Sequence, residues 1–186
     1  MFIWIFSSMR STYICCKVHW GERVISINTY IFDLKRDKVN ITDEKAISIS
    51  SDYQMRNNSL LEGFIHITYY DQSVISEEHC DDVELMWIGF LRMTLQYLEN
   101  GYGETSYFIH NQIWKMERIH TRKEKQVLFR IINNKMEKFL FDERIFMKEL
   151  IKSAEEFTSF VSMLAHPNSI TVLAPLLKKM INISID

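Results

Sequence analysis

The chain has 186 residues, of which 47% are hydrophobic and 25% are charged, and its formal net charge is −2. This length suits one domain of ordinary globular composition. Five glycines and two prolines leave little sequence for flexible linkers or low-complexity loops. The sequence pI of about 6.3 argues against a dedicated nucleic-acid binder.

Cysteine usage and the first residues predict the compartment. Cys15, Cys16 and Cys80 include no pair with C-x-x-C spacing, so we expect no disulfide framework and a reduced, cytoplasmic setting. The initial MFIWIFSSMR has too short an apolar run for a signal peptide or a membrane span. We therefore treat residues 1–20 as an N-terminal extension and expect no membrane association.

Three strands are predicted before the first helix. Residues 23–34 (RVISINTYIFDL) place Ile25, Ile27 and Ile31 on one face, which is typical of a strand with one buried side. Residues 46–50 (AISIS) alternate again through Ile47 and Ile49. Residues 61–70 (LEGFIHITYY) are rich in β-branched and aromatic side chains and predict a longer strand.

Apolar residues at intervals of three and four predict the first helix. One broad stripe is formed by Val83, Met86, Trp87, Phe90, Leu91, Thr94, Tyr97 and Leu98. Asp81 followed by Glu84 resembles a capping box, and acids in the first turn complement the helix dipole. Asn100-Gly101 supplies a left-handed stop.

The stretch YLENGYGETSY, residues 97–107, resembles a ligand-binding loop because it holds Gly101 and Gly103. A phosphate loop needs a strand before it and a helix after it. Here a helix precedes and a strand follows, and Glu104 would repel a phosphate. The two glycines are therefore interpreted as a helix stop and a tight turn.

The second half repeats the pattern of strands followed by a helix. We expect strands at 107–109, 113–119, 127–132 and 136–141, with turns at 120–125 and at Asn133-Asn134. Asp142 then caps a helix whose apolar stripe runs from Phe146 to Leu164. The order βββ-α-βββ(β)-α predicts an α+β domain at 21–166, with an antiparallel sheet and two main helices packed on it. Residues 167–186 form either a short docked helix or a loose tail.

Charge is distributed unevenly along the chain. Between Asp71 and Glu104 there are eight acids and one base, Arg92, whereas residues 105–152 hold eleven bases and six acids. Such an asymmetry can steer a charged macromolecule. The alternative, that the two segments pair with each other or face water, is the more ordinary interpretation.

The remaining candidate sites carry simpler interpretations. Residues 77–82 (EEHCDD) gather metal-capable side chains, but adjacent ligands rarely converge and no second His or Cys cluster supports them, so an acidic helix-entry loop is favoured. Residues 120–125 (HTRKEK) are a weak basic patch that includes Glu124. No G-x-S-x-G elbow is present, and acids beside Cys80 predict a raised thiol pKa. We expect no metal, cofactor, nucleic acid or catalysis.

The run from WIGFLRMTLQYLENGYGETSYF through Trp114 to FDERIFMKELIKSAEEFTSF is similar, in the order and character of its elements, to small bacterial immunity proteins of polymorphic toxins. The likeness spans about residues 21–164 and includes no catalytic motif. It implies a non-catalytic protein that occludes a basic toxin domain with an acidic and aromatic surface. The residues implied are Glu77, Glu78, Asp81, Asp82, Glu84, Glu99, Tyr102, Glu104 and Tyr107.

Two other classes of function stay open at this point. One is a structural or regulatory module that forms a homodimer through an exposed sheet edge. The other is a small enzyme whose site is assembled from residues that are scattered in the sequence.

Overall fold

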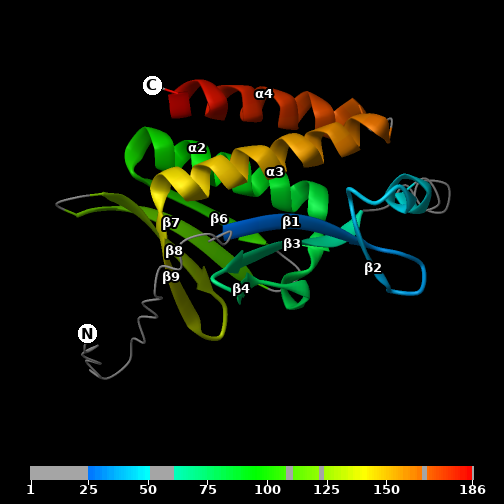
Figure 1. Cartoon of the computed structure of the whole chain (residues 1–186), viewed down its shortest axis with the longest axis horizontal. Coiled ribbons are helices and arrows are strands. Elements are labelled where there is room, and N and C mark those ends of the chain that lie inside the picture. The colour runs from blue at the N-terminus through cyan, green and yellow to red at the C-terminus, as the bar shows by residue number, and fades with distance from the viewer. Residues whose placement is uncertain (1–24, 51–60, 108–110, 122–123, 165–166, 186) are drawn as a thin grey trace.

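Two antiparallel sheets and three long helices make up the described residues, which are 25–50, 61–107, 111–121, 124–164 and 167–185. In this computed structural model the helices are α2 (Val83–Asn100), α3 (Glu143–Met163) and α4 (Pro167–Ile185). Figure 1 shows all three on the same side of the sheets, with α4 as an outer layer over α2 and α3. The predicted α+β class is confirmed.

The first sheet is built around the strands β1 (Ile25–Phe32) and β3 (Glu62–Tyr69), which pair antiparallel from Ile25↔Tyr69 to Ile31↔Gly63. The isoleucine face of β1 is buried, as the alternation predicts. The order of the sheet is β2-β1-β3-β4, with β5 also paired to β3. Its shorter elements are β2 (Lys38–Asn40), β4 (Gln72–Ile75), the 3-10 turn η1 (Glu77–His79) and β5 (Asp81–Asp82).

The prediction of a strand at 46–50 is wrong, because residues 45–50 are helical. Asp43 begins this helix, since its carboxylate accepts a hydrogen bond from the Lys45 amide at 3.0 Å. Ser50 Oγ then donates to the Ala46 carbonyl, one helical turn back, at 2.8 Å. A five-residue alternation of apolar and polar residues fits both a helix and a strand. The N-cap at Asp43 decides in favour of the helix.

The second sheet is a simple meander of four strands in the order β6-β7-β8-β9. The strands are β6 (Tyr102–Tyr107), β7 (Gln112–His120), β8 (Lys125–Ile132) and β9 (Met136–Asp142). The central hairpin runs in register from Ile113↔Ile132 to His120↔Lys125. The strands expected at 113–119, 127–132 and 136–141 are confirmed, whereas 107–109 marks only the end of β6 and lies largely outside the described residues.

Gly101 and Gly103, which follow α2, have different structural roles. Gly101 has φ 74° and its amide donates to the Tyr97 carbonyl at 2.7 Å, so it is the predicted left-handed stop. Gly103 is not in a turn but inside β6, and this part of the prediction is wrong. A Cβ at Gly103 would lie 2.0 Å from the Met93 carbonyl oxygen. Gly103 therefore lets β6 lie directly against the backbone of α2.

Aromatic side chains join the helices to both sheets. Phe90 of α2 contacts Trp114 and Phe129 of the second sheet at ring-centroid distances of 5.6 and 6.1 Å. Trp87, one turn earlier, donates from Nε1 to Thr29 Oγ1 of the first sheet at 3.0 Å. All of these side chains are buried. The core is thus continuous across the two sheets.

The C-terminal third is two helices. Asp142 caps α3 as expected, accepting from the Ile145 amide at 2.9 Å. Residues 167–185, for which a short docked helix was one expectation, form the long helix α4, whose Leu173, Leu177 and Met180 are buried against α2 and α3. Among the helices of the described ranges, none combines the length and apolarity needed to cross a bilayer.

Candidate functional site

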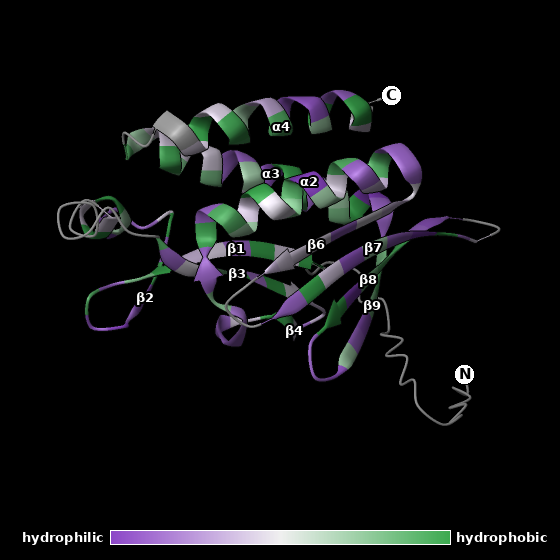
Figure 2. Ribbon diagram, turned by 180° about the vertical axis from the view of Figure 1, so that it is seen from behind, coloured by the Kyte–Doolittle hydropathy of each residue, from purple (hydrophilic) through white to green (hydrophobic). Residues whose placement is uncertain are grey.

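The face of the second sheet that points away from the helices is the most distinctive surface of the molecule. Alternate residues of its strands, such as Trp114, Phe129 and Phe141, are buried toward α2 and α3. The intervening residues point the other way, to the side that Figure 2 shows without helices. We name these residues the open face: Tyr102, Glu104, Ser106, Ile113, Lys115, Glu117, Ile119, Gln126, Leu128, Arg130, Ile132, Met136, Lys138 and Leu140.

Strand register arranges the open face in rows. The middle row crosses all four strands and is charged, because Glu104 pairs with Lys115, Lys115 with Arg130, and Arg130 with Lys138. The adjacent row consists of Ser106, Ile113, Ile132 and Met136. The row on the other side consists of Tyr102, Glu117, Leu128 and Leu140. A charged band therefore lies between two bands that are mostly apolar.

Seven large apolar side chains occupy the open face. Three of them are strongly exposed, with Met136 at 52%, Tyr102 at 42% and Leu140 at 38%. None of the seven belongs to the hydrophobic core; the other four, all partly exposed, are Ile113, Ile119, Leu128 and Ile132. The solvated face of an antiparallel sheet is ordinarily polar. Apolar side chains gathered on one exposed surface in this way are a common feature of interaction sites.

Two ion pairs lie within the open face. Lys115 Nζ lies 2.7 Å from the Glu104 carboxylate, and Arg130 forms an ion pair with Glu117. The hydrogen bond from Lys115 lowers the pKa of Glu104, and the same bond raises the pKa of Lys115. Tyr102 Oη also bonds to the Glu104 carboxylate, which raises the pKa of that tyrosine. Arg130 Nε is buried and has no hydrogen-bond acceptor among the described residues.

On the first sheet, the face that points away from the helices is covered by aromatic side chains of the sheet itself. Tyr30 stacks on Phe64 at 5.2 Å between centroids, and Phe32 packs beside Phe64 at 5.7 Å. Phe64 and Phe32 are consequently buried. Of the two sheets, the second is thus the one whose apolar side chains the described residues leave uncovered.

Four of the residues predicted for a partner-binding surface are buried instead. Asp82 is the N-cap of α2 and accepts from the Glu84 amide at 2.9 Å; Asp81 beside it is equally inaccessible. Glu84 accepts a hydrogen bond from Ser169 of α4, and Tyr107 Oη donates to the Met86 carbonyl at 3.0 Å. The expectation that these four side chains lie on an accessible acidic and aromatic surface is wrong, because all four are buried within the fold.

The other five predicted residues are exposed but do not form one acidic surface. Glu77 pairs with Lys38 at 3.2 Å and Glu99 with Lys179 at 2.6 Å. Glu78 lies close enough to Lys135 to contribute, after Glu137, to the raised pKa of that lysine. Tyr102 and Glu104 are brought together, on the first strand of the open face. Among the described residues, Glu77, Glu99 and Glu104 of the middle segment form ion pairs, but only Glu104 pairs with a base of the segment 105–152, namely Lys115.

The metal-capable segment at 77–82 is organised by its backbone. His79 is buried, and its Nδ1 accepts from the Ser76 amide at 3.2 Å. Within the described residues, no three His, Cys, Asp or Glu side chains are grouped in a way that could hold a metal ion. The pKa of Cys80 is raised, as predicted, although burial is the largest cause and the first contributing acid is Glu62.

Comparison with known proteins identifies no family model, curated protein or solved structure that matches this chain. The functional proposal for the chain therefore rests on the geometry and chemistry of its surface.

Proposed function

We propose that this chain is a non-catalytic protein-binding module and that its partner docks on the open face. The observation that carries the proposal is the row of apolar side chains on each side of the charged band, on a sheet face that the helices leave uncovered. Binding would remove these side chains from water, which is the main favourable term in most protein association.

The size of the open face suits the centre of an interface. Four strands about 4.8 Å apart, each contributing about 20 Å of length, give a flat area of roughly 400 Å². A standard interface buries about 800 Å² on each partner. The open face would therefore form the central part of the contact, and neighbouring loops would form its rim.

Side-chain types on the open face also favour a protein partner. Tyr102 and Arg130 belong to the types that dominate binding energies at protein interfaces. The charges do not favour proton-transfer chemistry, because the Glu104–Lys115 pair holds both groups in their ionised forms. The resemblance to immunity proteins gives the proposal a specific form, in which the partner is a toxin domain and Tyr102 and Glu104 belong to the contact.

Site-specific crosslinking tests the proposal in the cells that make the protein. A photoreactive benzoylphenylalanine replaces Met136 on the open face, and in a matched control variant it replaces Lys178, which is exposed on α4. We expect position 136 to crosslink one protein that position 178 does not, and the purified pair to bind each other.

Two results would contradict this proposal. Crosslinking of the same proteins from both positions would show that the contacts are not specific to the open face. Crosslinking of position 136 to a second copy of this chain would support a self-associating structural module instead.

A further inference from the structure

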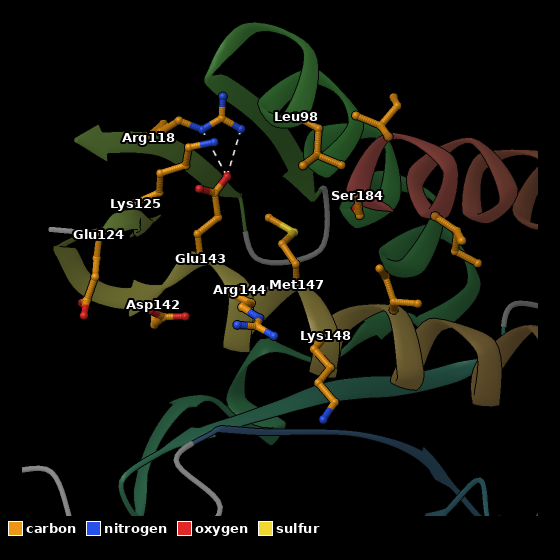
Figure 3. Close-up of a pocket in the computed structure, with 13 residues that line it drawn as sticks. Leu98, Arg118, Glu124, Lys125, Asp142, Glu143, Arg144, Met147, Lys148 and Ser184 are labelled. Atoms are coloured by element: carbon orange, nitrogen blue, oxygen red, sulfur yellow. Dashed lines mark hydrogen bonds and ion pairs between the residues drawn. The ribbon is translucent and has the colours of Figure 1, made fainter. Parts of the chain in front are cut away.

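A groove on the helix side of the molecule has the features of a second binding site. It has a volume of about 980 Å³ and lies between α3, the C-terminal half of α4, the end of α2 and the β7–β8 hairpin (Figure 3). It is separate from the open face, because Arg118 in its wall points to the opposite side of β7 from Lys115 and Glu117.

The floor of this groove is apolar. Leu98 of α2, Met147 and Ile151 of α3, and Ile181 and Ile183 of α4 line it. All except Met147 are partly exposed at the edge of the core. Because the floor remains open to water along two helices, it suits an elongated ligand better than a small molecule, which would ordinarily be enclosed over most of its surface.

The wall of the groove is held rigid by an ion pair. Arg118 donates to Glu143 Oε1 from Nε and Nη2 at 3.1 and 2.9 Å, as the dashed lines of Figure 3 indicate. Its guanidinium also lies 4.8 Å from the centroid of the buried Tyr97 ring. The charge of Arg118 is thus already matched, so ligand charge must be recognised by other residues.

Three cations on the rim supply that recognition. Lys125, Arg144 and Lys148 line the groove and are exposed, and none forms an ion pair within the part of the chain that the structure describes. Of the acids in the lining, Glu143 is paired with Arg118 and Asp142 caps α3. Glu124 and the partly exposed Asp142 offset two of the three cations, so the net charge of the rim is still positive.

We propose that the groove binds an acidic amphipathic helix of a partner protein. An apolar stripe with anchors at intervals of three and four residues would pack on the floor, between the ridges of α3 and α4. Carboxylates beside that stripe would face Lys125, Arg144 and Lys148, where opposite charge adds both affinity and orientation. This site is additional to the open face and does not depend on it.

The probe for this site is a fluorescein-labelled helical peptide of about 18 residues, with leucines along one face and glutamates on both flanks. A matched peptide has lysine in place of each glutamate. Fluorescence anisotropy with the full-length protein should show the glutamate peptide binding at least about tenfold more tightly, which corresponds to about 1.4 kcal/mol.

Charge reversal on the rim should invert that preference. In K125E/R144E/K148E the glutamate peptide should bind about 30-fold more weakly than to the wild-type protein. K35E/K45E/K178E makes the same change in net charge at exposed positions outside the groove, and it should retain the preference. Ile183→Ser on the floor should weaken both peptides, and thermal unfolding checks that each variant is folded.

Three outcomes would overturn the proposal: no binding of the glutamate peptide, equal binding of both peptides, or an unchanged preference in K125E/R144E/K148E. Saturable binding of oleate that the glutamate peptide cannot displace would assign the groove to an acyl-chain ligand instead. Retained peptide binding in the open-face variant M136K/L140K is expected, and its loss would also contradict a separate site.

Discussion

A side chain is disfavoured at Gly101 by the backbone conformation and at Gly103 by lack of space. Alanine substitutions distinguish these two causes. At Gly101 the space is free, since the nearest atom to an added Cβ is 3.7 Å away, but φ is 74°. Gly101→Ala should therefore cost only about 1 kcal/mol. At Gly103 an added Cβ meets the Met93 carbonyl, and backbone cannot yield as a side chain can. Gly103→Ala should cost about 3 kcal/mol or more.

Urea unfolding of the two glycine variants measures this difference directly. Equal losses would indicate that the contact between β6 and α2 is looser than the structure shows. Leu85→Ala, on the exposed side of α2, is a suitable control.

Asp82 gives the fold a pH dependence. Burial raises its pKa, although the hydrogen bonds from the Leu85 and Glu84 amides oppose that shift. Because the folded pKa lies above the unfolded value of about 3.9, folding favours the neutral carboxyl. The contribution of Asp82 to stability is therefore fully present below about pH 4 and is lost as pH rises through the folded pKa.

Asparagine at position 82 should keep the cap without the charge. We expect Asp82→Asn to be at least as stable as the wild-type protein at pH 7, with any gain shrinking toward pH 4. Asp82→Ala should be about 1 kcal/mol less stable than Asp82→Asn at both pH values. Urea unfolding at pH 7 and pH 4 checks this, and a clear loss in Asp82→Asn at pH 7 would mean that the ionised cap is preferred.

At the scale of the element, Pro175 lies inside the continuous helix α4. Proline has no amide hydrogen to donate in a helix interior, and the side chain of Pro175 is exposed. Pro175→Ala should therefore stabilise the protein by about 1–3 kcal/mol, which thermal unfolding measures. Lys178→Ala on the same helix should change little. A loss of stability in Pro175→Ala would show that the proline is needed to seat Leu173 and Leu177.

Elements with long periodic patterns could be predicted from the sequence. The stripes of α2 and α3 and the cap of α3 at Asp142 needed only spacing and local chemistry. The cap of α2 was expected at Asp81, with Glu84 as its capping-box partner, and this is wrong by one residue, because Asp82 accepts the hydrogen bonds of the first turn. Strands β4 and β5 were not predicted, because two to four residues carry no measurable period and depend on pairing with β3. The helix at 45–50 was missed because a short alternation does not distinguish helix from strand.

The candidate site was harder to predict than the fold. Acids near one another in sequence suggested one surface, but Asp81, Asp82 and Glu84 are buried by the caps and contacts at the start of α2. A usable signal lay in β8, where Leu128 and Ile132 alternate with Val127 and Phe129, so both faces of the strand are apolar. Which apolar face remains uncovered depends on where the helices pack, and that is a tertiary property.

At the scale of the whole molecule, the aromatic cluster should make the two sheets unfold together. Phe90 connects α2 to β7 and β8, and neighbouring Trp87 connects it to β1. Phe90→Ala should remove about 3–5 kcal/mol and lower the amide-exchange protection of β3 and β8 equally. Hydrogen exchange measures both. Loss of protection in β8 alone would show two independently unfolding units.

The central claim is that the open face binds a protein, and affinity measured with open-face variants tests it most directly. Met136 and Leu140 are exposed, so M136K/L140K should fold normally while placing two charges in the apolar rows of the open face. Calorimetric titration with the partner identified by crosslinking should show a Kd at least about 30-fold weaker, or about 2 kcal/mol. Lys178→Glu should stay within about twofold of the wild-type protein. An unchanged Kd in M136K/L140K would contradict the claim.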